Sequence, residues 1–269
     1  MKNIRKIARF MTLPIIGKEH RKTARQKTEA FLHKFFKTEY YRCEQIYLRE
    51  YEENRKIGFE KYHLISLGYN CFARMTFNYW GLKPRKSDGE KTMPFDISIH
   101  PLESVIRLLD SHFAHYFDKI EFSPEDNCWI NPELKITFVH DHENDKELFL
   151  ERYHNRIKAL DEAINDNIPC LFFAYNDGET EATQINQLYQ VLTKICAHKP
   201  FKLVYMVFNA PLSEGIDKNI ASYQADYPQG YVHMDKFTKY TQAGLGFEKA
   251  VVEFTRAQLK SFLKEQIKA

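Results

Sequence analysis

Cys71 is the residue whose position best suits it for chemistry. It follows a short apolar run at 63–67 and a glycine turn at Gly68, and it precedes apolar residues with helical spacing. This pattern predicts a buried strand, a tight turn and a helix that begins at the cysteine. The N–H groups and the positive dipole end at a helix start stabilise a thiolate and can bind an oxyanion. Cys71 is therefore a candidate nucleophile; the alternative is a buried cysteine that packs as a small hydrophobic residue.

A cysteine nucleophile needs a base and a group that orients the base. His140 is the first candidate for the base, because it ends an apolar strand-like segment and is followed by an aspartate. His233 is the second candidate. Asp96 or Asp141 would orient the imidazole. The ordinary alternatives are a histidine that is merely hydrogen-bonded and an aspartate that caps a helix.

Strands and helices alternate along the chain after residue 63. The expected strands are 63–67, 135–141, 169–174, 201–208 and 231–234, and the expected helices are 101–117, 145–165, 181–198 and 247–267. This alternation predicts an α/β fold with three layers, in which a mainly parallel sheet carries helices on both faces. In such sheets, ligands bind beyond the carboxyl ends of the strands.

Polar residues that follow the expected strands are the candidate substrate-binding groups. They are Asn70, Tyr175, Asn176, His233 and Asp235. Asn70 is also a candidate donor to an oxyanion. The His-Asp-His run at 140–142 lacks a second group of ligands, so no metal site is expected. There is neither a phosphate-binding glycine loop nor a dinucleotide fingerprint, so no cofactor is expected, and acyl-CoA is considered only as a co-substrate.

The first 37 residues are strongly basic. They contain eleven Lys or Arg and two Glu, whereas the net charge of the whole chain is only +3. Ile4, Ile7 and Phe10 share one side of a short basic helix, a pattern typical of binding to an anionic membrane surface. The alternative is a helix that packs on the body of the protein. We expect a basic N-terminal helical arm over 1–58 and an α/β catalytic domain over 59–269, without nucleic-acid binding.

The composition argues against several classes of protein. Hydrophobic residues make up 43% of the chain, which is enough for a packed core. No apolar run is long enough to span a bilayer, and the start lacks the features of a secretory signal. Five scattered cysteines without a CxxC pair indicate reduced thiols. The expected location is the cytoplasm, with peripheral binding at the inner membrane through the arm.

Three ordered motifs resemble a bacterial family described as papain-like cysteine peptidases. They are SLGYNC at 66–71, PFD at 94–96 and FVHD at 138–141, and the similarity covers about residues 62–210. The resemblance implies that Cys71 is the nucleophile and His140 the base. Ile97 departs from the pattern, because the family usually has tryptophan there.

A second resemblance agrees better with the expected fold. Papain-like folds carry an antiparallel sheet, whereas this chain shows alternating strands and helices. The turn before Cys71 is similar to the Gly-Asn-Cys turn of a capsule-polysaccharide acetyltransferase family with an SGNH-hydrolase-like sheet, although here Tyr69 separates Gly68 from Asn70. Both resemblances imply acyl chemistry through Cys71.

We therefore expect a cysteine-nucleophile acyl-transfer enzyme, either a papain-like thiol hydrolase or an acyltransferase. Its expected substrate is a glycan or peptide in the biosynthesis of bacterial capsule or lipopolysaccharide. The alternatives are a glycosyltransferase-like or sugar-phosphate enzyme of the same pathway, and a non-catalytic binding protein in which Cys71 is buried.

Overall fold

The computed structural model describes residues 2–268, apart from the side chains of residues 2, 236, 237 and 268. The chain forms two compact units. The helical unit contains the chain up to residue 50 together with residues 227–249, and the sheet unit contains residues 51–226 and the chain from residue 250 onward. The expected division into 1–58 and 59–269 differs from this grouping, because it assigns residues 51–58 to the arm and 227–249 to the catalytic domain.

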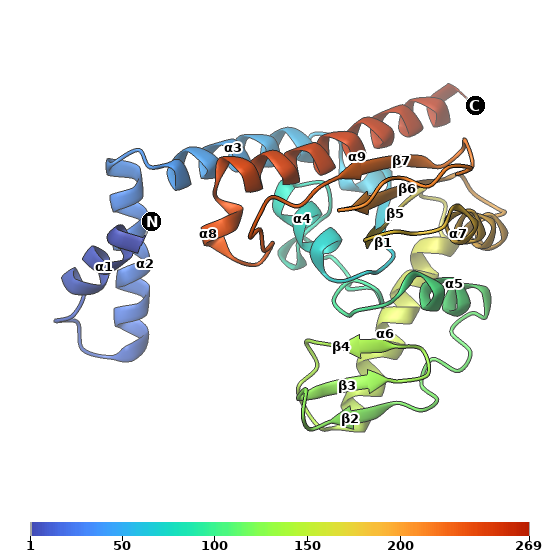
Figure 1. Cartoon of the computed structure of the whole chain (residues 1–269), viewed down its shortest axis with the longest axis horizontal. Helices are drawn as coiled ribbons and strands as arrows, with labels where there is room; N and C mark the ends of the chain where they lie inside the picture. The colour runs from blue at the N-terminus through green and yellow to red at the C-terminus, as the bar shows by residue number, and fades with distance from the viewer. Residues whose placement is uncertain (1, 269) are drawn as a thin grey trace. The chain divides into compact units, whose positions relative to one another are not determined.

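Four parallel strands form the centre of the sheet unit, in the order β1-β5-β6-β7 (Figure 1). They are β1 (His63–Ser66), β5 (Cys170–Asp177), β6 (Phe201–Phe208) and β7 (Ala221–Ala225). The residues of β1, β5 and β6 are mostly buried, as their apolar sequences predict, whereas those of the edge strand β7 are half-buried or exposed. The predicted first strand and the α/β fold with a parallel sheet are confirmed.

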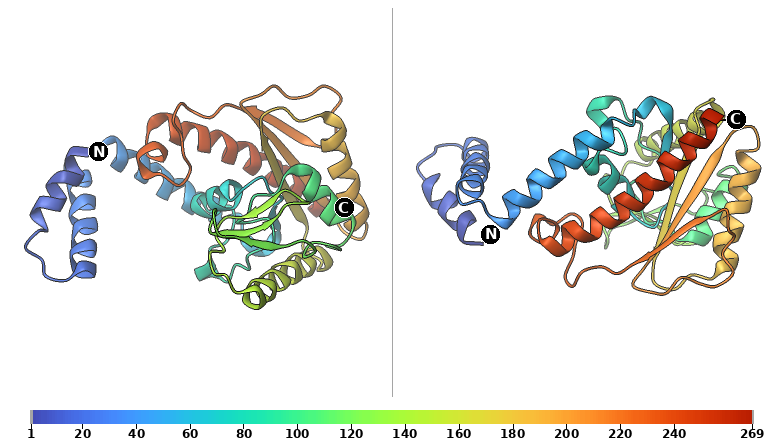
Figure 2. Two further views of the ribbon diagram at one scale, coloured as in Figure 1. Left: turned by 60° about the horizontal axis from the view of Figure 1, so that its bottom comes forward. Right: turned by 90° about the horizontal axis from the view of Figure 1, so that it is seen from above.

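Helices cover both faces of this sheet (Figure 2). On one face, Phe172 and Ala174 share a core with α5 (Leu102–Asp110), α6 (Lys146–Asn165) and α7 (Ala182–Ile195). On the other face, the ring of Phe173 contacts Phe77 of α4 (Phe72–Trp80) at 4.7 Å between centroids. That face is also covered by α9 (Gln242–Lys268), whose Phe254 stacks on Tyr223 of β7. The three-layer arrangement is therefore the predicted one.

The helical unit contains α1 (Lys2–Met11), α2 (Lys18–Phe35), α8 (Lys236–Lys239) and the first parts of α3 (Glu39–Arg55) and α9. The helix α1 packs on α2, and its Ala8 side chain is fully buried. Glu248 is also fully buried and accepts hydrogen bonds from Tyr47 at 2.7 Å and Tyr231 at 2.6 Å. None of the described helices is both long and apolar enough to cross a membrane.

A second, antiparallel sheet of three short strands was not predicted. Its strands are β2 (Glu121–Ser123), β3 (Cys128–Asn131) and β4 (Ile136–Phe138), in the order β2-β3-β4. The predicted strand 135–141 is thus β4, and it does not belong to the parallel sheet. Positive φ angles of 51° at Asn127 and 53° at Lys135 allow the tight connections between these strands. As a consequence, residues 140–142 do not follow a strand of the parallel sheet.

The predicted strand at 231–234 is absent from the described structure. Its apolar side chains, Val232 and Met234, are 51% and 55% exposed, so the segment has no buried face to support a strand. The fourth strand is β7 instead, ten residues earlier in the chain. The predicted helix at 101–117 is also too long. It ends at Asp110, and positive φ angles at His112, Phe113 and His115 follow.

Gly68 makes the turn between β1 and α4 possible. Its φ is +73°, and a Cβ atom there would lie 2.8 Å from the carbonyl oxygen of His100 and 3.2 Å from a methyl group of Val105. Short 3₁₀ turns occur at η1 (Phe59–Lys61) and η2 (Lys86–Asp88). Gly89, which follows η2, also has a positive φ, of +86°, but it has open space around it.

This difference gives a matched test of the turn. We expect Gly68→Ala to lower the free energy of unfolding by about 2–4 kcal/mol, because it adds a backbone clash to the cost of a positive φ. Gly89→Ala should cost only about 1 kcal/mol, the cost of the positive φ alone. Urea unfolding of both variants measures the two values, and equal losses would show that the space beside Gly68 adapts to a methyl group.

Candidate active site

The carboxyl edge of the parallel sheet brings Cys71, Asn70 and Tyr175 together. The backbone N–H of Leu67 still donates to the carbonyl oxygen of Phe173 at 2.8 Å, so the chain leaves the sheet only at Gly68. Cys71 then lies at the start of α4, as its N-cap residue. The predicted strand, turn and helix around the thiol are therefore present.

Asn70 is held in one orientation by two hydrogen bonds. Its Oδ1 accepts from the backbone N–H of Phe72 at 2.7 Å and from the Tyr175 hydroxyl at 2.6 Å. Because Oδ1 is the acceptor of both bonds, Nδ2 is the donor end of the amide. Nδ2 donates no hydrogen bond to any residue in the described part of the chain, and Asn70 is partly exposed. The amide of the residue before Cys71 is thus fixed and keeps an available donor.

Burial favours the protonated form of the Cys71 thiol. The residue is only 5% exposed, and burial raises the pKa of its thiol, although a backbone hydrogen bond and Arg74 act in the opposite direction. The expected lowering of the pKa by the helix start is therefore wrong. One physical reason is that Asn70 already occupies the first N–H group of α4, that of Phe72.

Asp96 lies in a buried ion network. Its carboxylate is fully buried and accepts from Lys83 Nζ at 2.9 Å and from the backbone N–H of Met93 at 2.7 Å. Arg74 lies 3.7 Å from the same carboxylate and pairs with Glu90 at 2.6 Å. Asp96, which lies in the connection after α4, therefore links this connection to Arg74 of α4. It makes no hydrogen bond to an imidazole among the described residues.

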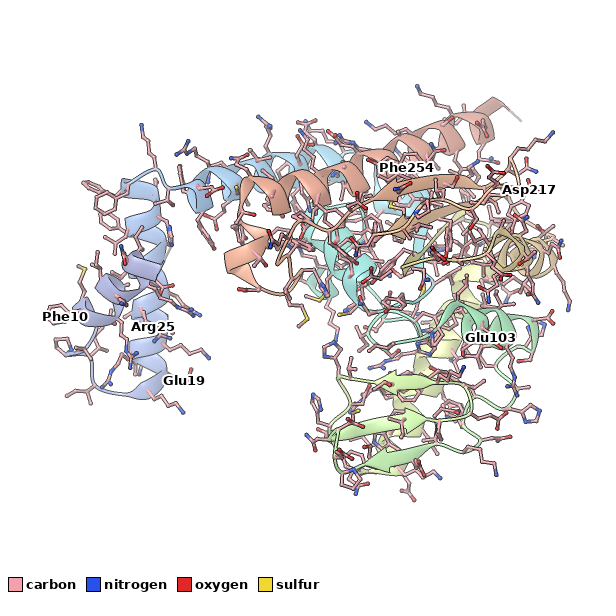
Figure 3. All side chains as sticks on the ribbon, viewed as in Figure 1. Phe10, Glu19, Arg25, Glu103, Asp217 and Phe254 are labelled. Carbon is pink, nitrogen blue, oxygen red and sulfur yellow. The ribbon has the colours of Figure 1, made fainter. Side chains whose placement is uncertain are left out.

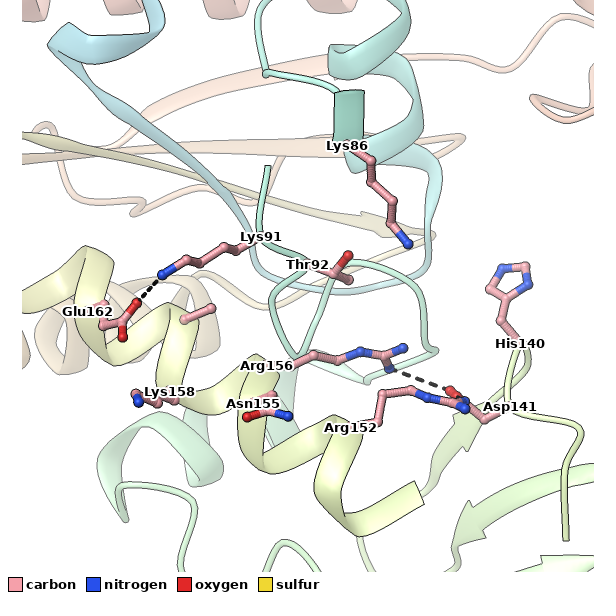
Figure 4. A pocket seen from close by; sticks show the side chains of 11 residues that line it. Lys86, Lys91, Thr92, His140, Asp141, Arg152, Asn155, Arg156, Lys158 and Glu162 are labelled. Carbon is pink, nitrogen blue, oxygen red and sulfur yellow. Dashed lines mark hydrogen bonds and ion pairs between the residues drawn. The ribbon is translucent and has the colours of Figure 1, made fainter. Parts of the chain in front are cut away.

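His140 and Asp141 lie on the wall of a cavity of about 670 Å³, next to α6 (Figure 4). The ring of His140 is exposed and makes no hydrogen bond with the residues that the structure describes. Asp141 is 2% exposed and binds Arg152, the Tyr153 hydroxyl at 3.0 Å and Arg156 at 3.5 Å. Asp141 therefore fixes the segment that carries His140 and does not orient its ring. Cys71 is not one of the residues that line this cavity.

The other predicted binding residues have different surroundings. Tyr175 is 2% exposed, and its hydroxyl donates to Asn70. The side chain of Asn176 donates to the Thr180 hydroxyl at 2.8 Å, within the turn that follows β5. His233 and Asp235 belong to the helical unit, whereas Cys71 belongs to the sheet unit. Asp235 lines a separate cavity of about 560 Å³ within the helical unit.

The cations that surround the buried carboxylates Asp96 and Asp141 were not predicted. Arg152 and Arg156 stand four residues apart in α6, beside Tyr153 and Leu160, which are buried in the core. This spacing places Arg156 on the buried side of α6. Because an unpaired buried cation is costly, an arginine at such a position in the sequence indicates a buried carboxylate as its partner.

His100 is a buried histidine that the sequence did not single out. Its ring lies between the Ser98 hydroxyl, at 3.1 Å, and the Tyr116 hydroxyl, at 2.9 Å. Burial lowers the pKa of His100 to about 3, so the ring is neutral at physiological pH. Its backbone N–H donates to the carbonyl oxygen of Tyr69 at 3.2 Å, which supports the turn before Cys71.

No group of three or more His, Cys, Asp or Glu residues in the described chain is arranged to hold a metal ion. Comparison of the chain with protein-family models, curated proteins and solved structures finds no match. The hypothesis for this site therefore depends on its own geometry and on the sequence motifs.

The raised pKa of Cys71 predicts its labelling behaviour. Folding favours the neutral thiol, so iodoacetamide should label Cys71 more slowly in the folded chain than in the urea-unfolded chain at the same pH. Below the thiol pKa, the rate in the folded chain should rise about tenfold per pH unit. Peptide mass spectrometry at pH 7, 8 and 9 measures this rate for each of the five cysteines. Faster labelling of Cys71 in the folded chain at pH 7 would contradict a raised pKa.

Proposed function

We propose that the protein is an enzyme that transfers or hydrolyses acyl groups through Cys71. The observation that carries the proposal is the fixed Asn70 amide, whose Nδ2 donor belongs to the residue immediately before the thiol at the start of α4. A donor that is already oriented before substrate binds can stabilise the oxyanion that forms when a thiol attacks a carbonyl group. The parallel sheet supports the proposal as well, because ligands bind at its carboxyl edge.

The raised pKa of the thiol determines which kind of mechanism is proposed. Cys71 rests as a thiol, so a base must accept its proton as Sγ bonds to the carbonyl carbon. His140, which the sequence motifs favour, is the proposed base, and its imidazolium then gives the proton to the departing alcohol, amine or thiol. Its exposed ring makes no hydrogen bond to Cys71 in the described structure, so the proposed mechanism requires the segment that carries His140 to bring the ring within reach of Sγ. The resulting thioester is cleaved by water in hydrolysis or by an acceptor hydroxyl in transfer.

Asp96 and Asp141 are proposed as positioning residues. Each carboxylate is committed to cations of its own, so neither is available to orient the His140 ring. Asp96 holds Arg74, which lies one helical turn after Cys71, and Asp141 holds the segment that carries His140. Their effect on the reaction would pass through these neighbours.

The substrate class comes from the sequence motifs. We propose a glycan or peptide of bacterial cell-surface polysaccharide synthesis, with acyl-CoA as a co-substrate if the reaction is a transfer, and activity in the cytoplasm. A non-catalytic protein with a buried Cys71 is the main alternative, and the slight exposure of the thiol favours it. A chemical assay of the thiol separates the two.

The assay is acetylation of Cys71 by p-nitrophenyl acetate, followed by release of p-nitrophenolate and by mass spectrometry. Cys71→Ser should abolish the adduct on this peptide. Asn70→Asp keeps an acceptor for Phe72 and Tyr175 but removes the Nδ2 donor, and we expect the acetylation rate to fall about 10²–10³-fold.

Rates are compared on the high-pH plateau, where a shift in the thiol pKa has no effect. Tyr175→Phe is the matched control, because it removes a bond to Asn70 and leaves the donor. Equal losses in Asn70→Asp and Tyr175→Phe would contradict the oxyanion role.

The same assay examines His140. His140→Ala should slow acetylation at pH 7 by about 10²-fold or more, and should leave the high-pH rate close to that of the wild type. The His140→Ala/Cys71→Ser double variant should release p-nitrophenolate no more slowly than Cys71→Ser alone, because the two residues act as one unit. His142→Ala is the matched control, since His142 is exposed and lies two residues away. Among the described residues its ring hydrogen-bonds only to the carbonyl oxygen of Asn127. Equal effects of the two histidine variants would contradict a base role for His140.

We also propose that the helical unit binds an anionic membrane surface. The relevant surface is the tip of the α1–α2 hairpin, residues 10–22. Phe10 is 76% exposed and Ile16 is 90% exposed, and Figure 3 shows Phe10 pointing away from α2. Four basic residues beside them line a shallow hollow, namely Lys18, Arg21, Lys22 and Arg25. Exposed apolar anchors next to basic side chains are what an anionic bilayer surface binds.

Vesicle binding tests this surface. We expect Phe10→Ser/Ile16→Ser to weaken co-sedimentation with phosphatidylglycerol-containing vesicles by about tenfold or more, since two apolar anchors are lost. Deletion of residues 1–16 should weaken it further while the sheet unit stays folded. Leu148→Ser/Ile267→Ser is the control, because Leu148 and Ile267 are 41% and 86% exposed and lie outside the tip. Unchanged binding of the tip variant, or equal loss in the control, would show that the tip does not bind lipid.

A further inference from the structure

The open cavity beside His140 is bordered by three segments of the sheet unit. Its volume is about 670 Å³, which is enough for a small organic ligand. One wall is a face of α6, a second is the segment after β4, and the third is the connection that contains η2 (Figure 4). The lining residues of α6 follow helical spacing from Arg152 to Glu162, so this wall is a continuous helix face.

The cavity has an excess of positive charge. Its lining contains the cations Lys86, Lys91, Arg152, Arg156 and Lys158, against the carboxylates Asp141 and Glu162. Lys91 pairs with Glu162 at 2.5 Å, and Arg152 also reaches Glu143 at 3.0 Å outside the lining. Lys86 and Lys158 form no ion pair with any residue that the structure describes, and both are exposed. Two ammonium groups therefore remain for an anion.

Arg156 adds a nearly buried cation to the exposed lysines that line the cavity. The residue is 8% exposed, its guanidinium lies 4.2 Å from the centre of the Tyr153 ring, and it approaches Asp141 at 3.5 Å. Asp141 also serves Arg152 and Tyr153, so a single carboxylate is shared by two guanidinium groups. A guanidinium has five N–H donors. Among the described residues Arg156 uses one of them, so a nearly buried cation keeps donors for a ligand in the cavity.

We propose that this cavity binds the phosphoryl group of a small organic phosphate. A planar guanidinium matches phosphate oxygens in pairs, and lysines add point charges around them. Thr92 and Asn155 supply neutral polar groups on the same lining. A phosphate with two negative charges matches the two unpaired ammonium groups better than a single carboxylate does. The inference does not depend on Cys71, although it places the ligand in the cavity that His140 lines.

Two sources of such a phosphate are distinguished by the choice of probe. Coenzyme A and a nucleoside diphosphate both carry a diphosphate, which pyrophosphate imitates in its simplest form. Isothermal titration of the full chain measures its affinity for pyrophosphate, UDP and coenzyme A. Binding of pyrophosphate reports on recognition of the diphosphate, and the affinities for UDP and coenzyme A distinguish the two sources. Tighter binding of coenzyme A or of UDP than of pyrophosphate supports the proposal and identifies the class of ligand.

The decisive variant is Lys86→Gln/Lys158→Gln, which alters two exposed side chains and leaves the buried network intact. We expect it to weaken pyrophosphate binding by about tenfold or more, because two charged contacts are lost. Lys146→Gln/Lys218→Gln removes the same charge from exposed positions outside the cavity, and it should bind as the wild type does. Arg156→Lys, which keeps the charge but not the planar fork, should also weaken binding, with its folding checked by thermal unfolding.

Two outcomes would overturn the proposal. One is the absence of binding by all three probes in the wild-type chain. The other is an equal loss in the control and cavity variants, which would show attraction to the net charge alone. Cys71→Ser should leave pyrophosphate binding unchanged, so failure of the thiol chemistry and failure of this site are distinguishable.

Discussion

Two buried carboxylates and the cations that neutralise them determine much of the architecture around the candidate sites. An unpaired carboxylate inside a protein costs several kcal/mol, so each one must draw cations from neighbouring segments. Asp96 draws Lys83 and Arg74, and this network joins the connection after α4 to the helix that begins at Cys71. Asp141 draws Arg152 and Arg156, and thereby joins the end of the small sheet to α6. The Asp141 network lines the cavity directly, and Arg74 of the Asp96 network donates to the hydroxyl of Thr92, which also lines it, at 3.4 Å.

The thiol and the amide beside it illustrate a conflict between packing and reactivity. The apolar residues that place Cys71 at the start of α4 also bury it, and burial favours the neutral form of the thiol. The Asn70 side chain uses one helix-start N–H group to fix its own orientation, so that group no longer stabilises a thiolate. The thiolate is therefore less stable, and this is why the proposed mechanism needs a base. In return, the Asn70 side chain is held so that its Nδ2 donor is oriented before substrate binds.

Much of the parallel sheet was predictable from sequence, because long apolar runs such as 169–174 and 201–208 have few other stable environments. The antiparallel sheet was not, since strands of three and four residues carry little periodicity and depend on partners distant in sequence. The position of Cys71 followed from local sequence, whereas the protonation of its thiol depends on residues packed around it. The role of Asp141 was likewise not predictable from local sequence, because its partners Arg152, Tyr153 and Arg156 lie in α6, 11 to 15 residues further along the chain.

The strand order has a consequence for how the protein folds. β1 and β5 are neighbours in the sheet, yet α4, α5, the small sheet and α6 all lie between them in sequence. The hydrogen bond between Asn70 and Tyr175 accordingly spans 105 residues, whereas β5 and β6 are joined through α7 alone. Closing a long loop costs more entropy than closing a short one, so β5, β6 and β7 should associate first and β1 should join later. The Cys71 turn would then be among the last parts of the sheet unit to form, and its amides among the first to exchange with solvent.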